Sequence, residues 1–216
     1  MCWQGPEKVA LAPLLPAAIP VLRMLQLPAV YGISNAVALG VESFLAGLEK
    51  ALQGGLRFVQ LREPGLAAVR FESLFEQVRE RCRTHRARLL VSAAHPPDFW
   101  RACDGVHLRG IDLRGLRERP GAGIVGASCH YAGELARAAD LGCDFAVLGP
   151  VQRTASHPGA APLGWTAFEA LVRGAQLPVF GLGGLSPGDA LQARRAGAHG
   201  LAMMRAVWPA PSSSMS

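Results

Sequence analysis

Short apolar runs and longer amphipathic segments alternate along most of the chain. From residue 29 onward, a run of apolar and β-branched residues is followed by a loop and then, in most cases, by a segment of helical periodicity. The apolar runs are Val30–Ser34, Phe58–Arg62, Leu89–Ser92, Gly105–Leu108, Ile124–Ser128, Phe145–Leu148, Val179–Leu182 and Gly200–Met204. The helical segments are Val41–Gln53, Phe71–His85, Glu134–Leu141, Thr166–Val172 and Pro187–Ala196. This pattern predicts strands that alternate with helices.

The apolar runs have the continuous hydrophobicity of strands buried on both faces, as in a parallel sheet covered by helices. Gly54-Gly55 follows one helical segment and Ser186-Pro187 precedes another, as expected at helix ends. Eight such units favour an α/β fold, a compact (β/α)8 TIM barrel, over an open sheet. We assign residues 29–208 to the barrel, 1–28 to an N-terminal extension and 209–216 to a tail.

Composition limits the class of protein. Of the 216 residues, 50% are hydrophobic and 18% are charged, so a large core can form and a disordered chain is excluded. No apolar stretch reaches the length of about 18 residues that a transmembrane helix needs. The opening segment is interrupted by prolines and lacks the features of a secretory signal. The five cysteines show no C-x-x-C spacing, so we expect a cytoplasmic protein without a disulfide framework or a zinc site.

The positive charge comes almost entirely from arginine. The formal net charge is +6, and only Lys8 and Lys50 are lysines among the 22 Lys and Arg residues. Basic residues gather between Arg79 and Arg88, which suggests either a nucleic-acid surface or the last turn of a helix, where cations favour the negative end of the dipole. Because no aromatic residue is interleaved with this cluster, the helix end is the favoured interpretation and nucleic acid is not an expected partner.

Polar side chains follow the second predicted strand, and a TIM barrel carries its chemistry at such strand ends. Gln60 and Arg62 lie on one side of this strand by alternation. An arginine fork suits the oxygens of phosphate or diphosphate. The alternative partner of Arg62 is a carboxylate of the core. We expect Gln60 and Arg62 to bind the substrate or its phosphate groups.

The fifth run ends at Ser128 and is followed by Cys129 and His130. Ser128 is placed to cap the next helix and also to offer its hydroxyl and the nearby amides to an anion. His130 is the candidate catalytic residue, because imidazole titrates near neutral pH and can act as a general base. A histidine that merely begins a helix is the alternative interpretation.

The last three loops favour a phosphate site. The loop after the sixth run is rich in hydroxyl and basic side chains, with Thr154 and His157 as candidate phosphate ligands in a lid over the substrate. Gly183 and Gly184 follow the seventh run and Arg205 follows the eighth, in the loops that commonly hold phosphate in TIM barrels. Glycine there lets backbone N–H groups approach the oxygens. The expected partner is a small phosphorylated substrate.

Five short motifs occur in a fixed order along residues 29–208. They are Gln60-Leu61-Arg62, Asp104-Gly105-Val106-His107-Leu108, Ser128-Cys129-His130, Leu148-Gly149-Pro150-Val151 and Gly183-Gly184-Leu185. Together they resemble the thiamine-phosphate synthase/TenI family, which implies a (β/α)8 barrel of thiamine biosynthesis or salvage. Synthase members of that family join a pyrimidine diphosphate to a thiazole phosphate with Mg²⁺ and release diphosphate. TenI-type members aromatise a thiazole phosphate carboxylate by proton transfer.

Several positions depart from the synthase pattern. Asp112 matches one metal aspartate, so the resemblance implies Mg²⁺ at Asp112. Glu63 is a further carboxylate that could join it, although the family pattern does not require it. The replacements are Pro64 for the lysine of Gln-x-Arg-x-Lys, Ser92-Ala93 for Asn-Asp, Arg109-Gly110 for Gly-Gln, His157 for a lid lysine and Arg205 for a serine. Removing one group that stabilises developing charge commonly costs about 10²–10³ in rate. We therefore expect weakened synthase catalysis.

Two classes of function follow for the barrel. The first is an enzyme that binds a phosphorylated thiazole, a pyrimidine diphosphate or both. Tautomerisation needs a phosphate site, an apolar pocket and a base such as His130, and it does not need the replaced lysines or aspartate. The alternative is a non-catalytic ligand-binding or partner module, which the incomplete metal site suggests.

The first 28 residues do not follow the β/α pattern. Trp3 and the segment 11–23 resemble the end of a Nudix (MutT-type) hydrolase of the kind found fused to a thiamine-phosphate-synthase-like domain. The segments 154–159 and 203–205 are similar to that fused subgroup as well. The Nudix box itself does not occur in the sequence. The resemblance implies a Nudix domain as a partner, and an ordinary extension packed under the barrel is the alternative.

Overall fold

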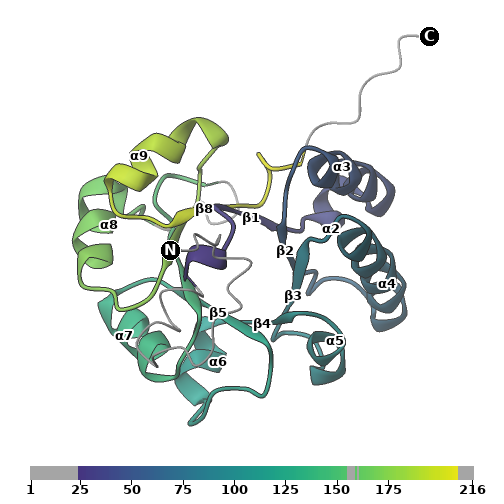
Figure 1. Cartoon of the computed structure of the whole chain (residues 1–216), viewed down its shortest axis with the longest axis horizontal. Helices are drawn as coiled ribbons and strands as arrows, with labels where there is room; N and C mark the ends of the chain where they lie inside the picture. The colour runs from purple at the N-terminus through teal and green to yellow at the C-terminus, as the bar shows by residue number, and fades with distance from the viewer. Residues whose placement is uncertain (1–23, 155–158, 160, 209–216) are drawn as a thin grey trace, which may run out of the picture.

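Eight parallel strands close into a barrel in the order in which they occur along the chain (Figure 1). The computed structural model describes residues 24–154, 159 and 161–208, so the predicted tail and most of the predicted extension lie outside the described residues. The strands are β1 (Val30–Ile33), β2 (Phe58–Leu61), β3 (Arg88–Ser92), β4 (Gly105–Leu108), β5 (Ile124–Cys129), β6 (Phe145–Leu148), β7 (Val179–Leu182) and β8 (Gly200–Met203). The closed barrel confirms the predicted fold class.

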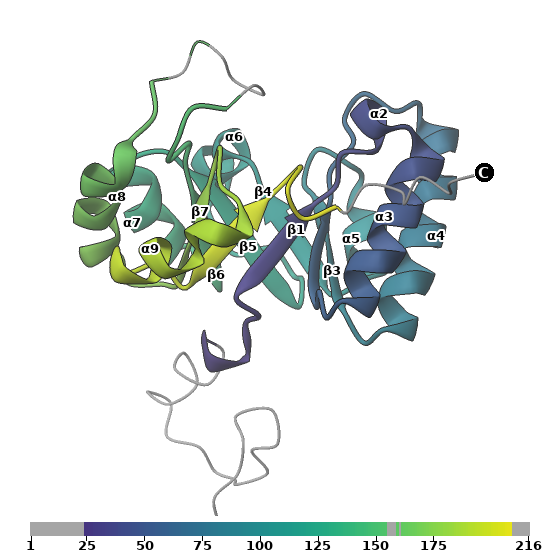
Figure 2. The same ribbon diagram turned by 90° about the horizontal axis from the view of Figure 1, so that it is seen from above.

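Helices flank the strands on both sides, as Figure 2 shows. They are α2 (Ala36–Leu39), α3 (Val41–Gln53), α4 (Ala68–Thr84), α5 (Pro97–Arg101), α6 (Gly110–Gly115), α7 (Ala132–Asp140), α8 (Gly164–Arg173) and α9 (Ala190–Arg195), with the 3₁₀ turn η2 (Pro187–Asp189) before α9. In the described ranges, no helix combines the length and the apolar character needed to cross a membrane.

The helical periodicity predicts α3 with its observed bounds, and it places the start of α4 three residues too late. The predicted helix Pro187–Ala196 is divided into η2 and α9. The division is at Asp189, whose Oδ2 accepts a hydrogen bond from the Ser186 N–H at 2.8 Å and closes the short turn. The sequence did not predict α2, α5 and α6, because four to six residues are too few to show a helical period.

Aromatic side chains fill the barrel interior. Tyr31, Phe58, Phe145 and Phe180 are fully buried, with ring centroids 4.3 Å apart for Tyr31 and Phe58 and 5.4 Å apart for Phe145 and Phe180. Gly126 makes room for this layer, because a Cβ at that position would lie 2.3 Å from Phe145 Cζ. The interior is therefore a packed core and not an open channel.

The last described residues secure the closure of the barrel. Trp208 is buried, and its Nε1 donates a hydrogen bond to the Ile33 carbonyl oxygen at 3.0 Å. Its ring packs edge-on against Phe44 of α3, with 5.1 Å between centroids. The segment after β8 is thus tied to β1 and α3 by both packing and a hydrogen bond.

The basic cluster between Arg79 and Arg88 lies at the C-terminal end of α4 and just beyond it. Arg83 pairs with Glu80 one turn earlier at 2.7 Å. His85 Nε2 contacts Glu49 Oε1 of α3 at 2.8 Å. These contacts match the helix-end interpretation of the cluster.

Candidate functional site

The C-terminal ends of the strands form one face of the barrel, uppermost in Figure 2. Two groups of polar residues and glycines lie on this face. We define the β2–β4 rim, which follows β2, β3 and β4, as Arg62, His95, Arg109 and Asp112. We define the β5–β8 rim, which follows β5, β7 and β8, as His130, Gly183, Gly184 and Arg205.

Gln60 and Arg62 stand at the end of β2. Phe58 packs in the barrel interior, so Gln60 faces the interior as well by strand alternation. Gln60 is only 1% exposed, and its Nε2 is without a hydrogen-bond partner among the described residues. Arg62 is exposed, and its backbone N–H donates to Ser34 Oγ at 2.8 Å. The two side chains have the positions expected of ligand-binding groups at a barrel mouth.

A chain of polar groups crosses the barrel beneath this face. Tyr31 OH lies 3.3 Å from His107 Nδ1, and His107 Nε2 lies 2.9 Å from Ser128 Oγ. Burial lowers the pKa of His107 to about 3, and the nearby charge of Arg62 acts in the same direction. Burial also raises the pKa of Tyr31 well above its usual range, against the smaller opposing effect of Gln60. Both rings are therefore neutral hydrogen-bonding groups.

This network gives Ser128 a different role from the expected helix cap. Helix α7 begins at Ala132 with Tyr131 as its N-cap, and no side chain caps it. Ser128 lies within β5, and its hydroxyl contacts His107 instead. Tyr31 and His107 are functional candidates that the sequence reasoning missed. A signal was present, because a polar residue inside a continuously apolar strand needs a partner in the interior.

His130 follows β5 and is exposed, while the carboxylate that holds it is buried. His130 Nδ1 lies 3.0 Å from Glu134 Oε2, and the same oxygen accepts the His130 backbone N–H at 2.8 Å. Glu134 is 3% exposed, and its Oε1 accepts a hydrogen bond from Arg114 Nη1 at 2.8 Å. A carboxylate at Nδ1 favours the tautomer with its proton on that nitrogen, which leaves Nε2 as a proton acceptor. A carboxylate placed in this way can orient an imidazole for proton transfer.

Gly183 and Gly184 form a turn that other residues fit poorly. Their φ angles are +101° and +67°. A Cβ at Gly183 would lie 2.6 Å from Pro150 Cβ, and one at Gly184 would lie 2.5 Å from the Arg153 carbonyl oxygen. Because β7 pairs with β8, the exposed Arg205 after β8 lies at the same edge. Such a turn can present backbone N–H groups to phosphate oxygens.

The predicted lid after β6 is described only in part. Thr154 is half-buried, whereas His157 lies outside the described residues. The assignment of both as phosphate ligands stays a prediction.

Asp112, the predicted magnesium ligand, is paired with a cation of the protein itself. Arg109 Nε lies 2.8 Å from Asp112 Oδ2, and Arg109 Nη2 lies 2.7 Å from Oδ1. The Arg109 backbone N–H also donates to Oδ2 at 2.8 Å. Burial opposes ionisation, but the hydrogen bonds and charge of Arg109 outweigh it and hold the pKa of Asp112 below its usual value. Three donors of one residue thus occupy both carboxylate oxygens.

Glu63, the second carboxylate considered for a metal, holds a helix instead. Its Oε1 accepts the Ala36 N–H at 2.6 Å and its Oε2 accepts the Val37 N–H at 3.0 Å, at the start of α2. Throughout the described residues, no three His, Cys, Asp or Glu side chains gather as a metal site. Mg²⁺ is usually held by one or two available carboxylates in near-octahedral oxygen coordination. The donor set of this face does not fit that ion.

His95 lies close to the arginines of the β2–β4 rim. Its ring stacks on Phe71 with 3.5 Å between centroids, and its Nε2 accepts the Glu63 N–H at 3.4 Å. Burial lowers the pKa of His95 to about 4, and the charges of Arg109 and Arg62 add to the effect. His95 is therefore neutral at pH 7, and the positive charge of this rim comes from its two arginines.

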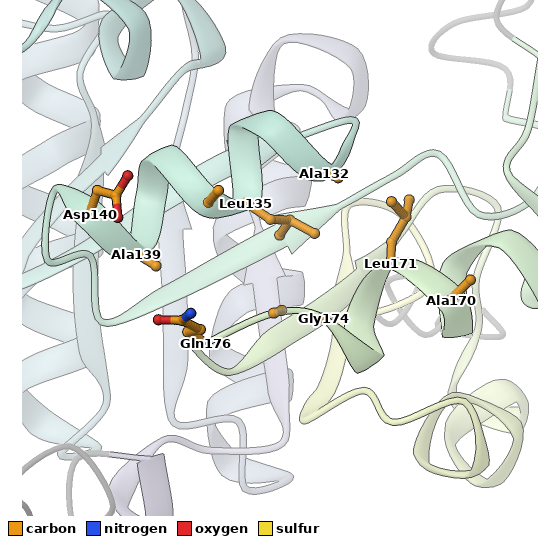
Figure 3. Close-up of a pocket in the computed structure, with 10 residues that line it drawn as sticks. Ala132, Leu135, Ala139, Asp140, Ala170, Leu171, Gly174 and Gln176 are labelled. Carbon is orange, nitrogen blue, oxygen red and sulfur yellow. The ribbon is translucent and has the colours of Figure 1, made fainter.

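An apolar groove of about 290 Å³ lies between α7 and α8, on the outside of the barrel (Figure 3). Alanine and leucine side chains line most of it, with Asp140 and Gln176 on one side. Of the predicted site residues that the structure describes, none lines this groove. It is therefore separate from the strand-end face.

The fold and the polar strand ends define a class, a (β/α)8-barrel protein with polar side chains after the C-terminal ends of its strands. The family within that class follows from comparison with known proteins. The family model of thiamine monophosphate synthase (TMP-TENI) matches residues 30–207. The chain belongs to this family, a TenI-like barrel of thiamine biosynthesis, and the resemblance noted in the motifs is confirmed.

Individual relatives support the assignment. A putative thiamine-phosphate synthase of Geobacter sulfurreducens is 36% identical over 82% of this chain and 85% of its own length. The thiamine biosynthesis bifunctional protein ThiM/ThiE of Symbiobacterium thermophilum is 39% identical over 76% of this chain, which spans only 35% of that longer protein. The thiamine phosphate pyrophosphorylase structure from Pyrococcus furiosus has a TM-score of 0.67 at 22% identity, covering 81% of this chain and 84% of that one, and it shares the fold.

Proposed function

We propose that the barrel binds a thiazole phosphate at the β5–β8 rim and isomerises it by proton transfer. The observation that carries the proposal is the contact between His130 Nδ1 and Glu134 Oε2 at 3.0 Å. An imidazole held in this way at the mouth of a barrel has an open nitrogen and a fixed orientation, which are the two requirements of a general base.

The proton transfer is balanced within the substrate. His130 Nε2 accepts a proton from a ring carbon, the ring double bond shifts, and the imidazolium returns a proton to another atom of the thiazole. The product has the same composition as the substrate, so no oxidant or second substrate is needed. Glu134 stabilises the imidazolium while it exists, because its carboxylate lies at hydrogen-bond distance from Nδ1.

The phosphate of this substrate is assigned to the turn at Gly183 and Gly184, with Arg205 beside it. The positive φ angles of the two glycines support this placement, since they allow a backbone shape that receives oxyanions. Strand β6 pairs with both β5 and β7, so a ligand with its phosphate at this turn can extend over the strand ends to His130 after β5.

Synthase chemistry is the second candidate, because Gln60 and Arg62 retain the family pattern. The buried, unpartnered Nε2 of Gln60 is suited to an acceptor on a heterocycle. A non-catalytic ligand-binding module is the third candidate. The same assay separates the three.

The assay offers the purified chain a thiazole phosphate carboxylate alone, or a thiazole phosphate with a pyrimidine diphosphate and Mg²⁺. We expect isomerisation in the first mixture, with His130→Gln reducing the rate about 10²- to 10⁴-fold, the usual range for a lost general base. His85→Gln is the matched control, since His85 also contacts a glutamate but on the outer helices. Formation of thiamine phosphate in the second mixture would support synthase chemistry. Binding without turnover in both favours the module.

We also propose a cytoplasmic setting and a fused or associated Nudix domain. The four cysteines in the described ranges are free, and burial raises the pKa of Cys82 to about 12, which suits a reducing compartment. The bifunctional relative supports the idea that barrels of this family are joined to other domains. Sequencing the full reading frame and its neighbours tests the Nudix proposal.

A further inference from the structure

The side chain that faces Asp112 departs from the family pattern. Where the pattern of the family has glycine, this chain has Arg109, and its guanidinium covers Asp112 with two side-chain contacts of 2.7 and 2.8 Å. The contacts use Nε and Nη2, so Nη1 is not part of this pair. Arg109 is about half exposed, at 46%, whereas Asp112 is 17% exposed. The guanidinium therefore stands between the carboxylate and the solvent.

Arg62 and Arg109 belong to strand ends that are close in space. Strand β3 pairs with both β2 and β4, and the two arginines follow β2 and β4. His95 follows β3, and the charges of both arginines act on it. Glu63 lies beside Arg62 in sequence, but both of its oxygens hold the N-terminus of α2. The charges open to a ligand here are the two guanidinium groups.

We propose that Arg109 takes the place of a divalent cation at Asp112, and that Arg109 and Arg62 together form a metal-independent site for an oxyanion group of the ligand. The bound group is a carboxylate or a diphosphate. Both carry several oxygens, and a guanidinium binds such groups through paired hydrogen bonds. Asp112 serves here to orient the guanidinium, and it is not a metal ligand. The inference rests on the proposed ligand class but not on proton transfer.

The first experiment measures anion binding by the full chain without a metal. Isothermal titration calorimetry is run with inorganic pyrophosphate and, separately, with malonate, each in EDTA and in millimolar Mg²⁺. We expect at least one probe to bind in EDTA, with an affinity that Mg²⁺ does not increase. The probe that binds more tightly tells a diphosphate site from a carboxylate site. Binding of either probe only when Mg²⁺ is present overturns the proposal, as does no binding of either.

Three variants locate the site. Arg109→Gln is expected to weaken the binding seen in EDTA about tenfold or more, as for loss of a hydrogen bond to a charged group. Asp112→Asn frees the guanidinium and is expected to keep or raise the affinity. Arg101→Gln is the matched control, because Arg101 also pairs with an aspartate three residues away but on α5. It should leave the affinity unchanged.

The result for Asp112→Asn distinguishes two roles of Asp112, as a metal ligand or as the residue that orients Arg109. If Asp112 holds a metal, Asp112→Asn abolishes Mg²⁺-dependent binding, and if it orients Arg109, binding persists. Thermal unfolding of each variant verifies that the barrel is intact. The measurement contains no turnover, so a failed isomerisation assay leaves this proposal standing, and a failed anion titration leaves the role of His130 standing.

Discussion

The charged groups of the two rims have different kinds of partner. On the β2–β4 rim the carboxylate of Asp112 is covered by Arg109, which donates three hydrogen bonds to it. On the β5–β8 rim the buried Glu134 holds one nitrogen of His130 and leaves the ring exposed. The oxygens of Asp112 already accept hydrogen bonds, so they are not available to a ligand. Glu134 contacts only Nδ1 of the His130 ring, so Nε2 remains available. This difference is why we propose ligand binding on the β2–β4 rim and proton transfer on the β5–β8 rim.

Glu134→Gln removes the carboxylate that holds His130 on the β5–β8 rim, and it should have the largest effect after His130→Gln itself. Without the carboxylate, the imidazolium loses its partner and the ring its fixed orientation, so we expect the isomerisation rate to fall roughly 10- to 100-fold, as for other partners that orient a functional histidine. Steady-state kinetics across pH 5–9 measures both kcat and the shape of the profile. Glu49→Gln, which removes the partner of His85, is the control. A Glu134→Gln profile that keeps both its height and its shape contradicts the positioning role.

Gly184→Ala tests the turn that we assign to phosphate. The φ of +67° and a Cβ contact of 2.5 Å to the Arg153 carbonyl oxygen predict a loss of about 1–3 kcal/mol in stability from strain. Weaker binding of thiazole phosphate should accompany it. Gly164→Ala is matched, with φ of +69° but no atom within 4 Å of the new Cβ. Urea unfolding and calorimetry of both variants measure the difference, and equal losses speak against a crowded turn at Gly184.

The pH dependence of stability should come from the half of the barrel around the β2–β4 rim. The pKa is lowered to about 3 for His107 and about 4 for His95, against about 6.5 for histidine in an unfolded chain. Between these values the unfolded state binds more protons, so stability is lost as the pH falls from about 6.5 toward 3. Each such histidine adds a slope of up to about 1.4 kcal/mol per pH unit.

His107→Asn removes one of these titrating groups from the interior. Urea unfolding at several pH values from 4 to 7 measures the slope, which does not depend on the constant cost of the substitution itself. We expect the slope to fall by about one proton. An unchanged slope means that the pKa of His107 is the same in the folded and the unfolded chain, which contradicts the effect of burial.

Ser34→Ala should have the smallest effect. Ser34 Oγ accepts the Arg62 N–H at 2.8 Å and so ties the start of the β2–β4 rim to β1. Leaving that N–H without its partner should cost about 1 kcal/mol, together with a slight loss of oxyanion affinity. Chemical unfolding measures the first and calorimetry the second. The exposed Ser43→Ala on α3 is the control, and indistinguishable results for the two serines show that the contact contributes nothing.

The strands and long helices could be predicted because their signal is local. Continuous apolar runs located all eight strands to within one residue at each end, and α3 was predicted with its observed bounds. The short helices were not predicted. Helix α2 has only four residues, and its start is stabilised by a hydrogen bond to Glu63 from another loop. The order of the strands in the barrel also followed from the number of units.

The candidate site could be predicted only as a set of residue types at strand ends. The sequence by itself determined the fold, the family motifs and the face that carries them, because hydrophobic periodicity and strand direction are properties of neighbouring residues. It did not reveal that Arg109 covers Asp112, that Ser128 contacts His107, or that Glu134 holds His130. Those pairings depend on the direction and the burial of each side chain. The sequence shows that a residue is Asp or Glu, but it does not show whether the carboxylate oxygens already accept hydrogen bonds within the protein. Only the tertiary structure decided which charges remain for a ligand.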